Sequence, residues 1–470
     1  MVLKKINDFT YEIPIEGEMK VPGKIFASEE LIENISGDKS LEQVKNVAKL
    51  PGILKNSFVM PDAHQGYGFP IGGVAVFDLE KGVISPGGVG YDINCSVRLL
   101  KTNLTRKDFE GKEREITKAL AKSIPSGVGR KGKLEIGMKE LDEVLLGGAQ
   151  WIVEKGYGFK EDFLHTEENG KMESANPSAV SQRAKGRGLP QLGSLGAGNH
   201  FLDVLIVDEV FDEEVAKVFG LEKGQVVMMI HCGSRGLGHQ VASDYIKLMN
   251  DEYGHPDFDR ELVYAPIKSE LGKKYFGAMS AAANFAFANK QVITHLARET
   301  MEEYFPDFRA DVVYDICHNI AKFEKHSVEG VEKEVLVVRK GATRSFGPGR
   351  EEIPEDYRSV GQPVLIPGSM GTASYVLCGT SEAEKLSFGS NAHGAGRVKS
   401  RSQMKKELTF EEARDKMKAQ KIFVESGSHK GMIEESPESY KNIEEVVNVS
   451  DKVGLGKKIA RLIPFLVIIG

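Results

Sequence analysis

Apolar residues along this chain fall into runs that predict strands and helices in a mixed order. Two β-branched runs, at residues 201–210 and 224–231, predict strands with a short helix at 212–220 between them. Further strands are predicted at residues 311–318, 334–341, 363–368 and 374–379. Because these elements do not alternate regularly, the pattern favours an α+β fold over a doubly wound sheet.

Other segments place apolar residues at helical spacing. They predict helices near residues 40–50, over 106–124 and 139–156, and a long alanine-rich helix over 269–305. No internal repeat or Pro/Ser-rich linker interrupts the chain, and no domain boundary is evident before about residue 400. We therefore expect one domain that spans residues 1–470.

Composition sets limits on the class of protein. The 470 residues are 41% hydrophobic and 28% charged, as in soluble globular proteins. The N-terminus lacks an apolar signal segment, the tail LIPFLVIIG is too short to span a bilayer, and four scattered cysteines make no disulfide scaffold. With no heptad or large apolar stripe, we expect a cytoplasmic monomer without membrane contact. Since the net charge is −6, a nucleic acid would need a local basic patch.

Metal-ligating side chains stand beside small-residue loops or at the ends of predicted strands: Asp92, Cys95, His200, His231 and His318. Such a set suits Mn, Zn, Fe or Co. Each residue alone has a structural alternative, because a strand-end histidine is often only hydrogen-bonded and a cysteine is often a small buried hydrophobe. Together they favour one shared metal site, although neither HExxH nor a paired CxxC is present. Cys232 follows His231 and Cys317 precedes His318 on predicted strands. Because neighbours on a strand point to opposite faces, these two thiols should face the core if the histidines face the metal.

Several glycine-rich or basic segments suit anions. The turn HCGSRGLGHQ offers backbone N–H groups and Arg235, and RKGATR offers Lys340 and Arg344. The loop PGSMGTASY has hydroxyls, and RVKSRSQMKK and QRAKGRG are basic. Each also has a simpler explanation as a solvated loop or helix face. Together they would give an acidic protein a local track for RNA or DNA phosphates.

His393 lies in a different setting, Asn-Ala-His-Gly-Ala-Gly-Arg. A neutral imidazole is a competent nucleophile near neutral pH. Nearby backbone N–H groups and Arg397 would stabilise charge that builds up on an attacked phosphorus. The alternatives are a sixth metal ligand or a histidine that stabilises the loop.

Taken in order, these motifs resemble those of the RtcB RNA-splicing ligases, most closely the archaeal members. The resemblance rests on PDAHQGYGFPIGG, GGVGYDINC, PQLGSLGAGNHF, HCGSRGLGHQ, HNIAK, RKGATR, IPGSMGTASYVL and HGAGR, and covers essentially the whole chain. It implies an α+β fold with a mixed β core, surrounding helices and a central metal-containing cleft.

The resemblance also implies an activity. An RtcB-type enzyme uses GTP and Mn(II) to join an RNA 3′-phosphate or 2′,3′-cyclic phosphate to a 5′-hydroxyl, in tRNA splicing or RNA repair. By resemblance, Asp92, Cys95, His200, His231 and His318 hold two Mn ions, with Cys95 as the bridge. His393 attacks the α-phosphorus of GTP, and the resulting histidine–GMP activates the 3′-phosphate. Asp62 lies near the RNA end, and an archease-like protein is a potential activator.

Contacts to the guanylate and to phosphates are implied in the same way. The expected GTP or GMP contacts are Asn199, Phe201, Asp203, Asn319, Pro367, Gly368, Ser369, Met370, Ser374, Gly394, Ala395, Gly396 and Tyr440. The expected RNA or phosphate contacts are Arg235, Lys340, Arg344 and Arg397.

Three positions depart from the family pattern. Ile469 stands where a lysine is usual, Asp203 where a glutamate is usual, and Val338 where a histidine is usual. These changes bear on guanine selectivity and activity. They leave two alternatives to the ligase open: a metal-dependent phosphatase or nuclease, which would not need His393, and a paralogue that binds RNA or nucleotide without ligating.

Overall fold

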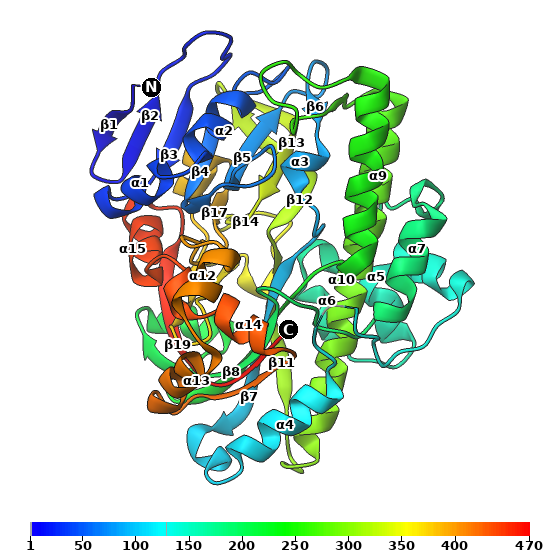
Figure 1. Ribbon diagram of the computed structural model, residues 1–470, viewed down its shortest axis with the longest axis vertical. Coiled ribbons are helices and arrows are strands. Elements are labelled where there is room, and N and C mark those ends of the chain that lie inside the picture. Colours follow the sequence, from blue (N-terminus) through cyan, green and yellow to red (C-terminus); the bar gives the residue numbers. More distant parts are fainter. Residues whose placement is uncertain (1, 128) are drawn as a thin grey trace.

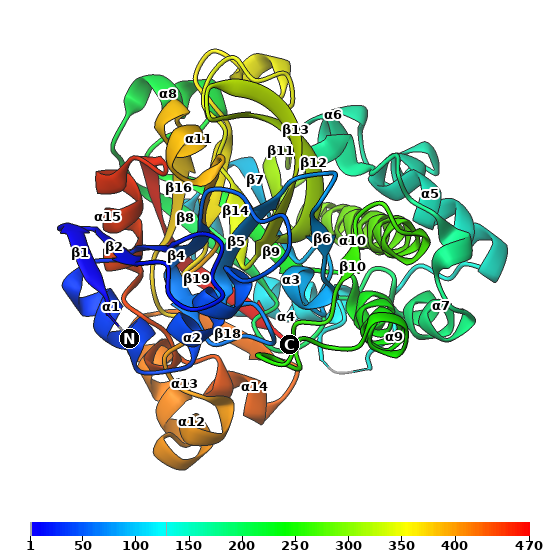
Figure 2. The same ribbon diagram turned by 90° about the horizontal axis from the view of Figure 1, so that it is seen from above.

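The computed structural model describes residues 2–127 and 129–470 and builds the protein around two large sheets (Figures 1 and 2). The first sheet has strand order β1-β2-β3-β4-β5-β13-β12. Its strands are β1 (Lys4–Asn7), β2 (Thr10–Ile13), β3 (Gly23–Phe26), β4 (Ser57–His64), β5 (Ile71–Phe77), β12 (Asn319–Val328) and β13 (Val331–Lys340). It is antiparallel except where β3 and β4 pair in parallel.

The second sheet has strand order β11-β7-β9-β8-β19-β16-β15, and β18 pairs in parallel with β19. Its strands are β7 (Ser96–Thr105), β8 (Phe201–Val210), β9 (Gln225–Cys232), β11 (Ala310–Cys317), β15 (Pro363–Ile366), β16 (Ser374–Cys378), β18 (Phe423–Ser426) and β19 (Lys457–Ile469). Two short pairs complete the strands, β14 (Ala342–Arg344) with β17 (Ser390–Ala392) and β6 (Val83–Ile84) with β10 (Ala265–Pro266).

Helices surround both sheets. The long α10 (Glu270–Glu302) packs against α9 (Arg235–Tyr253) and α5 (Met138–Glu154), and Figure 2 shows all three on one flank. The Ser269 side chain caps α10 by accepting from the Gly272 N–H at 3.0 Å. Nearly the whole middle of α10 is buried, which its small alanines permit by letting neighbouring elements approach closely. No helix among the described residues is both long and apolar enough to cross a membrane.

Shorter helices cover the remaining surfaces. They are α1 (Glu29–Ser36), α2 (Ser40–Val47), α3 (Pro86–Val89), α4 (Glu113–Ser123), α6 (Lys160–Leu164), α7 (Gln182–Gly188), α8 (Glu213–Phe219), α11 (Ser381–Ser387), α12 (Arg401–Glu407), α13 (Phe410–Ala419), α14 (His429–Glu434) and α15 (Ile443–Val453). Helices α12 to α14 and the end of β19 enclose a small methionine-rich core, which includes Met404, Met417 and Met432.

The α+β prediction is confirmed, and the predicted elements lie close to their expected positions. The expected helix over 106–124 is a 3-10 turn at Arg106–Phe109 followed by α4. The helix expected over 139–156 is α5, which bends at Gly148, where φ is +57°. Cys232 and Cys317 are buried in the hydrophobic cores, as the strand alternation predicted.

Strand register brings the predicted site residues to one place. His231 lies opposite Val97 on β7 and opposite Phe201 on β8. Cys95 precedes β7 and His200 precedes β8, so both lie beside His231. His318 joins β11 of one sheet to β12 of the other. The site therefore lies where the ends of strands from both sheets meet.

Candidate functional site

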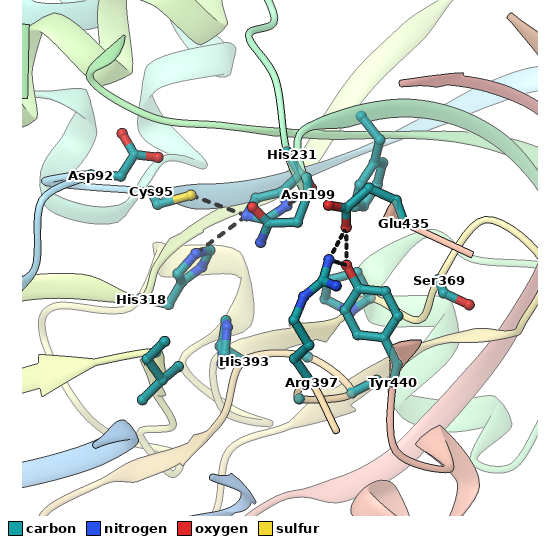
Figure 3. A pocket seen from close by; sticks show the side chains of 18 of the residues that line it. Asp92, Cys95, Asn199, His231, His318, Ser369, His393, Arg397, Glu435 and Tyr440 are labelled. Atoms are coloured by element: carbon teal, nitrogen blue, oxygen red, sulfur yellow. Dashed lines mark hydrogen bonds and ion pairs between the residues drawn. The ribbon is translucent and has the colours of Figure 1, made fainter. Parts of the chain in front are cut away.

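Three buried side chains form the centre of the site: Cys95, His200 and His231. Their ligand atoms all lie within 4.8 Å of one another. The Cys95 Sγ atom is 3.1 Å from His231 Nε2 and 3.4 Å from His200 Nε2. Asp92 Oδ2 lies 2.9 Å from His200 Nε2. His318 Nε2 lies 3.3 Å from His231 Nε2 (Figure 3). The structure thus brings together all five residues predicted to bind metal.

Backbone carbonyls orient the two central imidazoles. His200 Nδ1 lies 3.1 Å from the Leu195 carbonyl oxygen, and His231 Nδ1 lies 2.8 Å from the Asn199 carbonyl oxygen. A carbonyl only accepts, so both Nδ1 atoms carry a proton. His231 Nε2 is then bare and faces Cys95, whereas His200 Nε2 lies between Cys95 and the Asp92 carboxylate. Fixing the ring through its second nitrogen is the usual arrangement around a metal-ligating histidine.

The charges of this cluster also suit a cation. Although burial opposes ionisation, His200 and Arg235 hold the pKa of Asp92 well below its usual range. Burial lowers the pKa of His231 and of His318 well below the usual value, so both rings are neutral at neutral pH. A carboxylate, a thiol and neutral imidazoles are a donor set for a borderline divalent metal. Burial raises the pKa of Cys95, which a bound divalent cation would counteract.

His393 lies on the other side of His318, with 4.7 Å between their ring centroids. Its Nδ1 is 2.6 Å from Asp62 Oδ2, and the same oxygen accepts from the main-chain N–H groups of His393 at 3.0 Å and Gly394 at 3.2 Å. Asp62 is completely buried. A carboxylate that binds Nδ1–H leaves Nε2 as the bare, nucleophilic nitrogen of the ring.

Close packing around Asp62 explains a glycine of the HGAGR motif. Gly396 has φ of +77°, and a Cβ atom there would lie 2.0 Å from the Asp62 carbonyl oxygen. Any other residue would be strained and would clash with backbone. The glycine thus lets the His393 loop lie directly on β4, which carries Asp62.

A cavity of about 460 Å³ adjoins His393 and the metal-type cluster, which consists of Asp92, Cys95, His200, His231 and His318. This volume is within the range of small-molecule sites. Many predicted contacts line it: Asp92, Cys95, Asn199, Phe201, Asp203, His231, His318, Asn319, Lys340, Pro367, Gly368, Ser369, Met370, His393, Gly394, Ala395, Gly396, Arg397 and Tyr440. Ile469, one of the departures from the family pattern, also lines it.

Comparisons with known proteins agree with this geometry. A sequence model of the family described as "tRNA-splicing ligase RtcB" matches residues 43–470. A Thermococcus kodakarensis protein named tRNA-splicing ligase RtcB is 53% identical over 470 residues, which cover 98% of each chain. Proteins of the same name from Methanococcus maripaludis and Archaeoglobus fulgidus are 52% and 49% identical, over 99% and 98% of each chain. The chain belongs to the RtcB family. The resemblance stated from the motifs is therefore confirmed.

A few residues predicted for this RtcB-family site do not line the cavity. Ser374 supports it from behind, because its hydroxyl accepts from the Gly368 N–H at 3.0 Å. Arg235 begins α9 with a positive φ of 56°, and its Nε donates to Ser194 Oγ at 3.4 Å. Arg344 is buried and is bound to Gln362 Oε1 at 3.0 Å and Glu168 Oε1 at 3.1 Å. The Arg344 guanidinium is therefore engaged within the protein and is not available to a phosphate in the cavity.

Sequence reasoning missed several cavity residues, among them the polar residues Glu435 and His64. Glu435 lines the cavity, is 4% exposed, and accepts from Arg397 Nη2 at 2.8 Å and from the Tyr440 hydroxyl (Figure 3). No motif marked it. His64, within the motif PDAHQGYGFPIGG, lines the cavity with Nδ1 3.1 Å from the Asp62 carbonyl oxygen. Burial lowers the pKa of His64 to about 4, so its bare Nε2 is a hydrogen-bond acceptor at neutral pH.

Proposed function

We propose that this protein is an RNA ligase of tRNA splicing that joins RNA 3′-phosphate or 2′,3′-cyclic phosphate ends to 5′-hydroxyl ends. Membership of the RtcB family supports this function, since relatives that match the chain over nearly its whole length are named tRNA-splicing ligases. The single observation that carries the mechanism is the contact between Asp62 and His393 at the edge of a nucleotide-sized cavity.

In the proposed mechanism His393 Nε2 attacks the α-phosphorus of GTP. The N–P bond forms, the bond to the β-phosphate oxygen breaks, and pyrophosphate leaves. Asp62 holds the Nδ1 proton and stabilises the positive charge that develops on the ring. Arg397 and the main-chain N–H groups of Ala395 and Gly396, residues that line the cavity, would stabilise charge on the phosphate oxygens.

Two transfers complete the reaction. A cyclic end is first opened by water to the 3′-phosphate. That phosphate attacks the phosphorus on His393, the N–P bond breaks, and a 3′-pyrophosphate-linked guanylate forms on the RNA. The 5′-hydroxyl then attacks the 3′ phosphorus, loses its proton, and GMP leaves. A phosphate monoester has no good leaving group, which is why the GMP must be attached first.

The proposed metal is Mn(II), held as two ions by Asp92, Cys95, His200, His231 and His318. The residues fit, because their ligand atoms converge and the backbone carbonyls at Leu195 and Asn199 fix two of the rings. When bound, such ions neutralise negative charge on phosphate oxygens and on the leaving group. We further propose one catalytic domain over residues 1–470, an archease-like activator, a monomeric state and a cytoplasmic location.

The test uses Mn(II) and GTP labelled at the α-phosphate, followed by denaturation of the protein. We expect label that stays on the protein, is released by acid and resists alkali, as a histidine phosphoramidate does. His393→Ala should abolish it, and the control His255→Ala, which changes an exposed histidine, should retain it. Absence of label on the wild-type protein would reject the guanylylation mechanism. Processing of a 3′-phosphate end by His393→Ala would instead support a phosphatase or nuclease.

A further inference from the structure

A second cavity lies beside the first, on the other side of the last residues of β19. It has a volume of about 690 Å³ and is lined by residues of α4, of the loop that follows α4, and of β18. Gly427 lines this second cavity and donates its N–H to the Ile469 carbonyl oxygen at 2.9 Å. Ile469 lines the first cavity. A wall about one strand thick therefore separates the two cavities, close to the C-terminus marked in Figure 1.

The second cavity is basic. Lys122, Arg130 and Lys131 line it and are exposed, and Glu425 is the one acidic residue among the described residues that line it. Lys118, also exposed, precedes Lys122 by one helical turn and extends the basic surface along α4. The chain as a whole carries a net charge of −6. This concentration of cations is therefore a local feature, as binding of a polyanion by an acidic protein requires.

The wall of the second cavity is hydrogen-bonded to the loop that leads into His200. Gly127 donates its N–H to the Gly196 carbonyl oxygen at 2.6 Å, and Leu195 donates to the Pro125 carbonyl oxygen at 2.9 Å. The Leu195 carbonyl oxygen in turn orients His200. An anion in the second cavity would thus be held at a defined position relative to the first.

We propose that the second cavity, with Lys122, Arg130 and Lys131, binds the phosphodiester backbone of a single-stranded RNA whose end occupies the first cavity. This inference rests on the proposed ligase function. No aromatic side chain is among the described lining residues, so the contacts would be to phosphates and sugars rather than to stacked bases. Glu425 can accept a hydrogen bond from a ribose 2′-hydroxyl, which an RNA strand has and a DNA strand lacks.

The test compares the variant Lys122→Ala/Arg130→Ala/Lys131→Ala with a control, Lys217→Ala/Lys247→Ala/Lys333→Ala, which removes three exposed lysines elsewhere. Binding of a 3′-phosphorylated strand of about 12 nucleotides is followed by fluorescence anisotropy at several salt concentrations. We expect the first variant to bind at least about tenfold more weakly, with a salt slope smaller by about 2, since each lost phosphate contact removes about 0.7. The control should bind as the wild-type protein does.

Two further ligands test the assignment. A 3′-phosphorylated dinucleotide, which is too short to reach the second cavity from the first, should bind the variant and the wild-type protein equally. Inorganic phosphate at matched ionic strength should compete poorly with the long strand. Equal weakening of the dinucleotide, full competition by phosphate, or unchanged binding of the long strand would overturn the proposal.

Unfolding temperatures of all variants show whether the fold is intact, and Arg130→Ala alone, with an expected slope change of about 0.7, provides a milder test. The proposed function is tested separately by the GTP label on the wild-type protein. Label together with unchanged RNA binding by the variant would reject the second RNA site and leave the ligase standing.

Discussion

The Asp62 carboxylate holds His393 twice with the same oxygen, at the ring Nδ1 and at the main-chain N–H. The ring is therefore fixed in both tautomer and position. We expect Asp62→Asn to slow formation of the GMP adduct by about 10²–10⁴-fold, because an amide can present its N–H group and favour the wrong tautomer. The rate of label uptake measures this. A variant that labels at the wild-type rate would show that Asp62 has only a structural role.

Glu435 should be a positioning residue for the nucleotide. It binds both Arg397 and Tyr440, and the Arg397 guanidinium lies 4.9 Å from the centre of the Tyr440 ring. We expect Glu435→Ala to raise the KM for GTP about tenfold to a hundredfold, since loss of a buried charge-assisted hydrogen bond costs about 1.5–3 kcal/mol.

Glu435→Gln, which keeps an acceptor oxygen, should recover part of this loss. Glu434→Ala is the matched control, because Glu434 pairs with Arg401 and Lys405. If kcat fell while KM stayed constant, Glu435 would act in the chemical step rather than in positioning.

Binding of metal should stabilise the native protein measurably. A ligand that binds only the folded state, present at about 100 times its Kd, adds about 2.7 kcal/mol. We therefore expect added Mn(II) to raise the Tm of the wild-type protein and a chelator to lower it. Cys95→Ser and His231→Asn should reduce the shift, while Cys378→Ser, at a buried cysteine that does not line the cavity, should retain it. An equal shift in all proteins would place the metal elsewhere.

The charge of Lys340 should make anion binding depend on pH. Its ammonium group donates to the carbonyl oxygens of Tyr67, Phe69 and Gly87, and burial lowers its pKa to about 7. The positive charge is present below that pH and is lost as the pH rises through it, although a bound phosphate moves the midpoint upward. The advantage of the wild-type protein over Lys340→Met in binding GTP should shrink from pH 6 to pH 9.

Calorimetric titration at several pH values checks this, with Lys325→Met, at an exposed lysine, as the control. A constant ratio of GTP affinities would show that the charge does not reach the ligand.

The lowered pKa of Lys340 should also make the stability of the fold depend on pH. Between pH 7 and the ordinary lysine pKa, the unfolded state binds more protons, so the wild-type protein gains stability as the pH rises. Lys340→Met should remove that slope.

Ile469 should limit the preference for guanine. Ile469 on β19 lies opposite Phe201 on β8 and is therefore diagonal to Asp203. Burial raises the pKa of Asp203, and its Oδ1 has no hydrogen-bond partner among the described residues. A lysine at 469 would favour the charged form of Asp203 and provide a donor. We expect Ile469→Lys to increase the ratio of GMP to AMP adduct several-fold, while Ile469→Met leaves it unchanged.

Periodicity predicted the elements whose burial pattern is regular. The strand at 201–210 lies almost where expected because apolar residues cover one of its faces. The long α10 does so because its middle is buried on nearly every side. The strand β19 was not predicted, although it lies inside the second sheet, because Arg461 and Pro464 interrupt its apolar run and register shifts accommodate them. Tertiary pairing, which a local pattern does not contain, defines this strand.

The same limit applies to the site. His200, His231 and Cys95 could be identified because chemically reactive residue types beside glycine stand out. Glu435 could not, because its role follows from contacts with Arg397 and Tyr440. Arg344 shows the reverse. Its basic motif indicated a phosphate contact, while its guanidinium lies beside the carboxylates of Glu167 and Glu168.

Asp92 and His318 contribute to one cluster from positions far apart in the chain, and His318 itself links the two sheets. All five ligands nevertheless stand in or directly beside strands of the second sheet, β7, β8, β9 and β11. The first sheet supplies Asp62, on β4, which orients His393. A chain damaged in the first sheet would therefore keep the ligand set and lose the oriented nucleophile, so metal affinity alone would not distinguish competent molecules from damaged ones.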